Sequence, residues 1–223
     1  MATPARQQYL DIKSQHPDQI LLFRMGDFYE TFDDDARILA RELEISLTSR
    51  EMGKGEKIPL AGIPYHSLNN YLGKLISKNY KVAICEQVSD PKVGKGIVDR
   101  RVVRVATAGT IVEDSLLSSG INNFLASVII SEPYAGLAYI DLTTSEFYTS
   151  QISLSELASE ISRIDPKEII TSTSEQIANL ASLPIDITKV ESNYFDSENH
   201  FQTFVKPHQH LSEGSLNHNQ RNL

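Results

Sequence analysis

The stretch LLFRMGDFYETFDDDARILARELE, residues 21–44, decides the fold of the amino-terminal half of this chain. Its first four residues form a short apolar strand that ends at Met25-Gly26. Beyond that point the apolar residues recur at helical spacing, so we predict a helix from Asp27 to about Glu44. The predicted buried face of this helix consists of Phe32, Ala36, Leu39 and Leu43.

Elements that follow this stretch complete a first domain, which we assign to residues 1–106. Residues 50–58 carry two glycines among charged residues and are predicted to form an exposed loop. Strands at 81–88 and 98–106 flank a second glycine-containing loop, which makes the domain α/β. Between the two loops a helix begins at Ser67 as its N-cap, with an inward face of Leu68, Tyr71, Leu72, Leu75 and Ile76.

The second half of the chain predicts a mixed sheet. Residues 107–119 are interpreted as a linker and residues 120–200 as a second domain. Apolar periodicity ends near Asn199, so residues 201–223 are predicted to be a disordered tail. Strands are predicted at 123–130, 136–142, 146–152, 168–171 and 185–190. Helices are predicted around Leu154, Leu157, Ile161 and Ile164, and near 175–181.

The formal net charge of the whole chain, −8, argues against a nucleic-acid binder, but this charge is unevenly distributed between the two halves of the chain. Residues 1–106 hold 16 Lys and Arg against 14 Asp and Glu, whereas residues 107–223 hold 5 against 15. Within residues 50–104 there are 11 basic and 5 acidic residues. A polyanion would interact with that segment, and the acidic half should face solvent or protein.

Composition excludes several classes of protein. No apolar run reaches about 18 residues and no signal-peptide pattern is present, so we expect neither a membrane-spanning nor a secreted protein. The single cysteine, Cys85, forms no internal disulfide, which fits the cytoplasm, and we interpret it as a small core residue. The histidines of the polar tail lack the spacing of zinc ligands; they are His200, His208, His210 and His218.

The segment GDFYE, residues 26–30, permits two interpretations. In the structural one, Asp27 and Glu30 form a capping box and Phe28 shares the buried helix face with Phe32. In the functional one, an aromatic residue in the first turn of a helix enters a DNA groove and stacks on a mispaired base, which unstacks at lower cost. Glu30 is repelled by phosphates, so it would then contact a base edge. The spacing alone leaves both interpretations open.

Carboxylates suggest a third interpretation, a metal-dependent nuclease. The residues concerned are Asp27, Glu30, Asp33, Asp34 and Asp35 in the first domain, and Asp141 and Glu146 in the second. Consecutive helix residues point about 100° apart, so we expect the run of three aspartates to be an exposed first turn instead. Asp141 has no evident carboxylate partner.

Basic residues on the glycine-containing loops suit phosphate contacts, because loops can follow a curved backbone. They are Arg50, Lys54, Lys57, Lys92 and Lys95. A solvated face is the alternative for each lysine. Arg100, Arg101 and Arg104 alternate with valines in a strand, so we expect at least one of them to pack against a helix.

Several segments together resemble the MutS family of DNA mismatch repair proteins. They are residues 26–30 followed by Phe32, IPLAGIPYH at 58–66, AICEQ at 83–87, and RRVVR at 100–104 closing on TAGT at 107–110. They occur in the order and at the spacing of the family, and the match covers about residues 3–195.

The resemblance implies a fold and a set of site residues. Phe28 matches the family's stacking wedge, and Glu30 matches the glutamate that hydrogen-bonds the mispaired base. Other matched positions lie along the DNA: Met25, Arg50, and the segment 60–66 with Leu60, Pro64 and His66. The implied fold class is α/β, with a mixed-sheet mismatch-recognition domain followed by an RNase H-like connector domain that is incomplete here.

The expected function is therefore recognition of mismatched double-stranded DNA, which is bent on binding. No phosphate-binding motif of the form Gly-x-x-x-x-Gly-Lys-Ser/Thr occurs, so we expect neither enzymatic activity nor a cofactor. In the family, ATP and Mg belong to a separate ATPase domain. The connector domain implies a MutL-like protein partner, and a protein-interaction module without DNA binding of its own is the main alternative.

Overall fold

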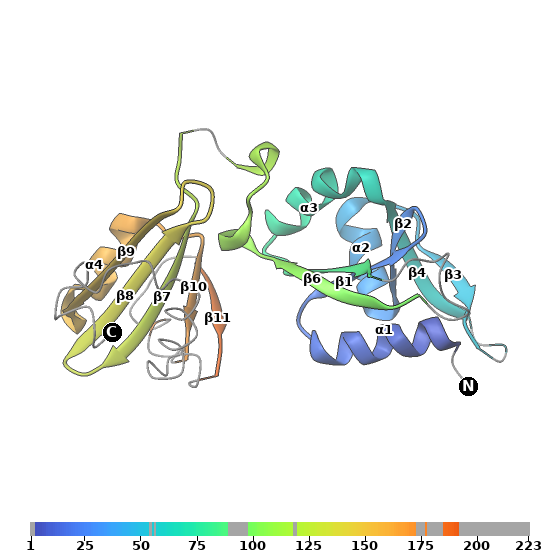
Figure 1. Ribbon diagram of the computed structural model, residues 1–223, viewed down its shortest axis with the longest axis horizontal. Coiled ribbons are helices and arrows are strands. Elements are labelled where there is room, and N and C mark those ends of the chain that lie inside the picture. Colours follow the sequence, from blue (N-terminus) through green and yellow to red (C-terminus); the bar gives the residue numbers. More distant parts are fainter. Residues whose placement is uncertain are drawn as a thin grey trace. The chain divides into compact units, whose positions relative to one another are not determined.

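The computed structural model describes residues 3–53, 55, 57–88, 98–117, 120–172, 177 and 185–191. The chain divides into two compact units. Unit 1 comprises residues 1–108 and 113–116, and unit 2 comprises residues 109–112 and 117–223. Each unit contains a mixed sheet with helices (Figure 1), which confirms the expected α/β class.

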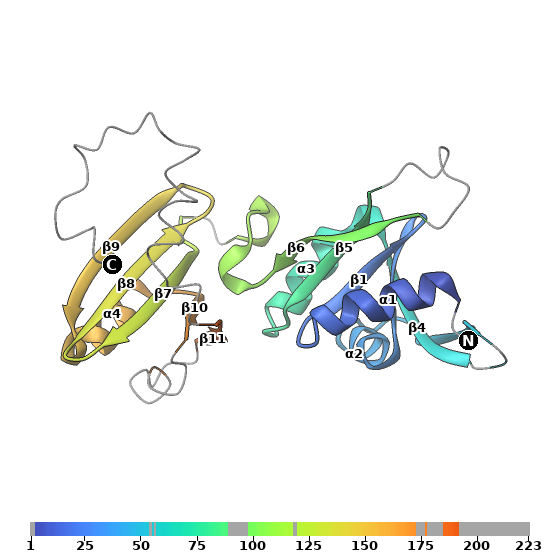
Figure 2. The ribbon, with the colours of Figure 1, turned by 60° about the horizontal axis from the view of Figure 1, so that its bottom comes forward.

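Unit 1 is a six-stranded sheet in the order β3-β4-β2-β1-β5-β6. Only β1 and β5 pair in parallel among its described strands. Figures 1 and 2 show α1 on one face of this sheet and α2 with α3 on the other. The strands are β1 (Ile20–Met25), β2 (Phe28–Phe32), β3 (Thr48–Glu51), β4 (Lys57–Pro64), β5 (Val82–Gln87) and β6 (Arg100–Ala106). The helices are α1 (Pro4–Gln15), α2 (Asp33–Leu43) and α3 (Leu68–Ile76), with 3-10 helix η1 (Tyr65–Ser67) before α3.

The core on the α1 face of unit 1 is built around aromatic rings. The Tyr9 ring of α1 meets the rings of Phe23 and Phe32 edge to face, with centroids 5.6 Å and 4.7 Å apart. Cys85 lies in the same cluster, as expected, and burial raises the pKa of its thiol to about 12. The buried members of this cluster are Tyr9, Leu21, Phe23, Phe32, Met52, Ile58, Leu60, Ala83 and Cys85.

The helix predicted from Asp27 is wrong in its first turns. Residues 28–32 form strand β2, which pairs with β1 and β4, and α2 begins only at Asp33. Asp27 and Glu30 therefore form no capping box. The rest of the prediction is confirmed, because Ala36, Leu39 and Leu43 are buried on α2.

The exposed loop predicted at residues 50–58 is also wrong in part. β3 pairs with the start of β4 in an antiparallel hairpin, so Arg50 and Lys57 lie on strands. The glycines occupy the connection, where Gly55 has a φ of +73°.

Helix α1 was not anticipated from apolar periodicity, since its sequence PARQQYLDIKSQ is mostly polar. Its start nevertheless carries a local signal. Thr3 is the N-cap and accepts a hydrogen bond from the Arg6 backbone N–H, and Pro4 occupies the first helical turn.

Unit 2 contains a five-stranded sheet in the order β11-β10-β7-β8-β9. β7, β8 and β9 form an antiparallel meander, whereas β10 and β11 continue the sheet in parallel with β7. The strands are β7 (Phe124–Ser131), β8 (Tyr134–Asp141), β9 (Glu146–Ser153), β10 (Glu168–Thr171) and β11 (Asp186–Lys189), and 3-10 helix η4 (Leu154–Glu156) leads into α4 (Leu157–Ile164). Five predicted strands and the first predicted helix are thus confirmed.

Helix α4 packs its apolar residues on one face of this sheet. Leu157 and Ile161 are fully buried against strand residues that include Ala126 and Leu137. Of the second predicted helix only Ile177 is described, and it is helical. The predicted tail at 201–223 and its histidines lie outside the described residues.

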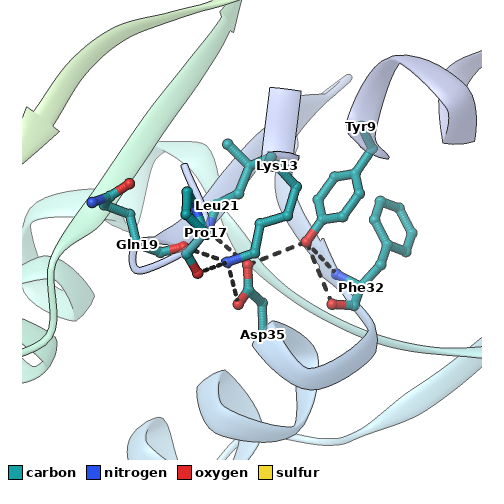
Figure 3. A network of polar contacts seen from close by, with 7 residues as sticks. All are labelled: Tyr9, Lys13, Pro17, Gln19, Leu21, Phe32 and Asp35. Atoms are coloured by element: carbon teal, nitrogen blue, oxygen red, sulfur yellow. Dashed lines mark hydrogen bonds and ion pairs between the residues drawn. The ribbon is translucent and has the colours of Figure 1, made fainter. Parts of the chain in front are cut away.

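Asp35 corrects the expectation of an exposed aspartate run. Asp34 is exposed, but Asp35 is buried at 6% exposure. Its carboxylate accepts hydrogen bonds from the Leu21 backbone N–H at 3.0 Å and from the Lys13 Nζ at 2.9 Å (Figure 3). The Tyr9 hydroxyl lies 3.3 Å from the same carboxylate. Asp35 of α2 therefore ties α1 to the first residues of β1.

We predict that Asp35→Asn destabilises unit 1 by about 1–3 kcal/mol, because the charge that satisfies these buried donors is lost. The rate at which a thiol reagent modifies Cys85 measures the opening of unit 1 alone, since Cys85 is the single cysteine and is buried there. Asp34→Asn, on the same turn, is the matched control and should leave the rate unchanged. Equal rates for Asp35→Asn and the unmodified chain would contradict the role given to Asp35.

Candidate nucleic-acid interface

Phe28 stands at a tight turn between β1 and β2. Met25 and Phe28 are the last paired residues, so only Gly26 and Asp27 form the turn. Gly26 adopts a φ of +59°, which glycine takes without strain. The Phe28 side chain is 47% exposed beside this turn. A large aromatic residue is thus presented at a hairpin end, not at the helix start that the sequence had suggested.

Glu30 lies on the same face of β2 as Phe28, because alternate strand residues share a face. It is only 9% exposed, and Phe32, the next residue on that face, is 1% exposed. The Glu30 carboxylate accepts a hydrogen bond from the Arg50 guanidinium at 2.8 Å. The row from Phe28 to Phe32 therefore passes from solvent into the core, with an ion pair at its middle.

Gly62 lies beside this ion pair, where the backbone of β2 comes close. It is the cross-strand neighbour of Glu30 on β4. A Cβ at this position would lie 3.0 Å from the Tyr29 carbonyl oxygen and 3.6 Å from the Glu30 Cγ. The close approach of the β2 backbone therefore favours a glycine at this position of the segment 58–66.

The other predicted site residues lie at several places in unit 1. Met25 and Pro64 flank Phe28 in the sheet register, and His66 is exposed in η1. Lys57 is exposed at the start of β4. The Leu60 side chain packs in the core cluster and is unavailable at the surface. Lys54, Lys92 and Lys95 lie outside the described residues.

Sequence reasoning missed a group of residues behind the turn. Arg24 donates a hydrogen bond to the Gly26 carbonyl oxygen at 2.6 Å, and its guanidinium lies over the Tyr65 ring, 3.9 Å from the centroid. The Tyr29 hydroxyl donates to Glu86. Burial, followed by this hydrogen bond, raises the pKa of Tyr29 to about 12, so Tyr29 keeps its proton. No local sequence pattern marks this group, because Tyr65 and Glu86 come from segments distant from Arg24.

The arginines of β6 differ from one another, as expected. Arg100 is buried, lies over the Phe23 ring, and donates to the Gln8 side chain of α1 at 3.0 Å. Burial lowers its pKa. Arg101 is exposed and pairs with Asp99 at 3.2 Å. Arg100 is thus the arginine that packs inside.

The carboxylates do not support a metal-dependent nuclease in the described part of the chain. No group of three or more His, Cys, Asp and Glu residues there could hold a metal ion. Asp33 pairs with Arg6, and Asp35 is bonded as described above. Asp141 accepts hydrogen bonds from the backbone N–H groups of Asn123 and Thr143, so it closes the β8–β9 turn.

No helix among the described residues has the length and apolar character needed to cross a membrane.

Comparison with known proteins gives matches to both units. Residues 3–115 match the family model of MutS domain I, and residues 123–221 match that of MutS domain II. The DNA mismatch repair protein MutS of Dehalococcoides mccartyi strain CBDB1 is 56% identical over 196 residues, covering 88% of this chain and 23% of that protein. The protein of the same name from Symbiobacterium thermophilum is 45% identical over 222 residues, covering 96% of this chain and 25% of that protein.

The chain therefore spans about a quarter of the length of these relatives. The model of domain I covers all the segments that had suggested the MutS family, and the relatives are MutS proteins as well. The chain belongs to the MutS family and comprises its domains I and II.

Proposed function

We propose that this chain binds double-stranded DNA at a mispaired or unpaired base, with Phe28 stacked on that base and Glu30 hydrogen-bonded to it. The observation that carries the proposal is the exposed Phe28 at a tight hairpin end, with an acid two residues further on the same face. Apolar side chains that enter a base step kink the duplex and favour steps that are already weakened. The compartment proposed for this role is the cytoplasm, which the single cysteine, Cys85, fits.

Basic residues of the β3–β4 hairpin give the proposal a second contact region. Along β4, Lys57 lies seven residues from Pro64, the register partner of Phe28, which corresponds to roughly 23 Å at the rise of a strand. Lys57 would therefore contact phosphates several base pairs from the base that Phe28 reads. Contacts of this kind fix the position of the protein on DNA, whereas the wedge supplies selectivity.

The ion pair between Glu30 and Arg50 gives a mechanism for selectivity. The Glu30 side chain is 12% exposed and the Arg50 side chain 45% exposed, so the arginine is the more accessible partner. On matched DNA Glu30 finds no suitable base edge and keeps Arg50 as its counter-ion. At a mispair Glu30 bonds to the base, and Arg50 is released to a phosphate. Arg50 thereby couples base reading to phosphate binding.

We also propose that unit 2 binds a MutL-like repair protein. Its half of the chain is strongly acidic, with 15 acidic and 5 basic residues in 107–223, which disfavours direct phosphate contact. Binding of the chain to such a protein in the absence of DNA would support this role, and an absence of binding would remove it. ATP hydrolysis is not part of the function proposed for these residues.

Phe28→Ala is predicted to reduce the preference for a G·T duplex over a matched duplex by about tenfold or more, since stacking on one base contributes about 1–3 kcal/mol. Fluorescence anisotropy at low salt measures both dissociation constants. Tyr134→Ala removes an aromatic side chain of similar exposure, 50%, from unit 2 and should leave the preference intact. Absence of any preference in the unmodified chain would refute the proposed function for this chain.

Arg50→Gln is predicted to change the salt dependence of binding on one duplex only. The slope of log K against log salt concentration should fall by about 0.9 on the G·T duplex, where Arg50 contacts a phosphate, and stay constant on matched DNA. Lys57→Gln is the control, and its effect should be equal on both duplexes. If Arg50→Gln lowers both slopes equally, Arg50 is a plain phosphate contact and the coupling is wrong.

A further inference from the structure

The turn that carries Phe28 has little packing of its own at its tip. Gly26 and Asp27 are exposed, and a Cβ added to Gly26 would meet no atom within 4 Å. A side chain that must enter a base stack needs a fixed orientation, because a displacement of about 1 Å removes much of the benefit of a prearranged contact. The rigidity of the turn must therefore come from groups behind it.

Arg24 contacts the turn from the other face of the sheet. It is the register partner of Tyr29, so its side chain lies opposite to the face of Phe28 and Glu30. Its Nε donates to the Gly26 carbonyl oxygen at 2.6 Å. Its guanidinium carbon lies 3.9 Å from the centroid of the Tyr65 ring and 5.5 Å from that of the Tyr29 ring.

Burial strengthens these contacts. The Arg24 side chain is 18% exposed, so its charge is largely removed from water. Cation–π contacts contribute more to stability when the cation is desolvated in this way. The Glu86 carboxylate lies 3.8 Å from Arg24 and accepts the Tyr29 hydroxyl proton in a hydrogen bond. The positive charge of Arg24 is thus balanced by the negative charge of Glu86 on β5.

The partners of Arg24 are themselves attached to the turn. The Tyr65 backbone N–H donates to the Asp27 carbonyl oxygen at 3.0 Å, and Tyr29 follows Phe28 directly in the chain. Both carbonyl groups of the turn therefore accept a hydrogen bond from this group of residues. A shift of the turn would break its hydrogen bonds to Arg24 and to Tyr65 of η1.

We propose that Arg24 is a positioning residue, which holds the β1–β2 turn so that Phe28 keeps the orientation needed for insertion into DNA. The inference rests on the proposed function of Phe28 and assigns no DNA contact to Arg24. A planar guanidinium is needed, because it stacks on the Tyr65 ring and donates in its own plane to the Gly26 carbonyl oxygen. A lysine ammonium lacks this geometry.

The test compares Arg24→Met and Arg24→Lys in the full chain with Arg41→Met as the matched control. Arg41 of α2 also contacts a tyrosine and a glutamate, since it donates to the Tyr80 hydroxyl at 3.1 Å and pairs with Glu42 at 2.8 Å. Two quantities are measured: the ratio of dissociation constants for matched and G·T duplexes, and the hydrogen-exchange rate of the Tyr65 amide, which reports on the turn directly.

For Arg24→Met we expect the mismatch preference to fall about tenfold while the dissociation constant for matched DNA changes less than about twofold. The Tyr65 amide should exchange at least about tenfold faster. Arg24→Lys should lose most of the preference as well, and Arg41→Met should change neither quantity.

The proposal is overturned if Arg24→Met weakens both duplexes equally, if the Tyr65 amide is unaffected, or if Arg24→Lys retains the full preference. A lack of preference in the unmodified chain would instead remove the proposed function. In that case the amide exchange still decides whether Arg24 fixes the turn.

Discussion

The Asp35 carboxylate joins three elements in the interior of unit 1. A buried carboxylate is costly unless donors surround it, and here Lys13 of α1, the Leu21 backbone N–H of β1 and the Tyr9 hydroxyl lie around it. Lys13 also donates to the Gln19 carbonyl oxygen at 2.6 Å, which fixes the connection between α1 and β1. Helix α1 is mostly polar, so this network and the Tyr9 ring determine where it lies on the sheet.

The position of α1 in turn determines where the covered face of the sheet ends. Phe32, Glu30 and Phe28 follow one another on that face with exposures of 1%, 9% and 47%. The first contacts the Tyr9 ring, and the last lies beyond the helix at the turn. Glu30 falls at the boundary, where a carboxylate is partly shielded from water but still has a charged partner in Arg50. A candidate reader of bases is thus placed by the same packing that closes the core.

Much of unit 2 and the strands of unit 1 could be predicted, because alternating or continuous apolar runs bounded by turn residues specify strands locally. The error at Asp27 has a physical cause. Phe28 and Phe32 are four residues apart, and that spacing places two residues on one face of either a helix or a strand. Only pairing with β1 and β4, which is set by distant sequence, resolves the ambiguity.

Other features could not be predicted because their partners are distant in sequence. Nothing in the run of three aspartates distinguishes Asp35 from its neighbour Asp34; the donors that bury it come from α1 and β1. The Arg24 group likewise joins residues separated by up to 62 positions, from Arg24 to Glu86. Thr3-Pro4, in contrast, is a local signal for the start of α1, a helix whose mostly polar sequence lacks apolar periodicity.

Several arginines of unit 1 are less available to a polyanion than a count of its basic residues suggests. Within residues 50–104, Arg50, Arg101 and Arg104 lie within 4.0 Å of carboxylates, and Arg100 is buried. Part of the positive charge counted in this segment is therefore already compensated inside the unit. Long-range attraction to a polyanion then depends on exposed lysines such as Lys57, whereas a paired arginine contributes only after it exchanges its carboxylate for a phosphate. Such an exchange requires the carboxylate to gain another partner, and for Glu30 that partner would be a base edge. On the proposed function, charge pairing in the free protein would favour selectivity over general affinity for DNA.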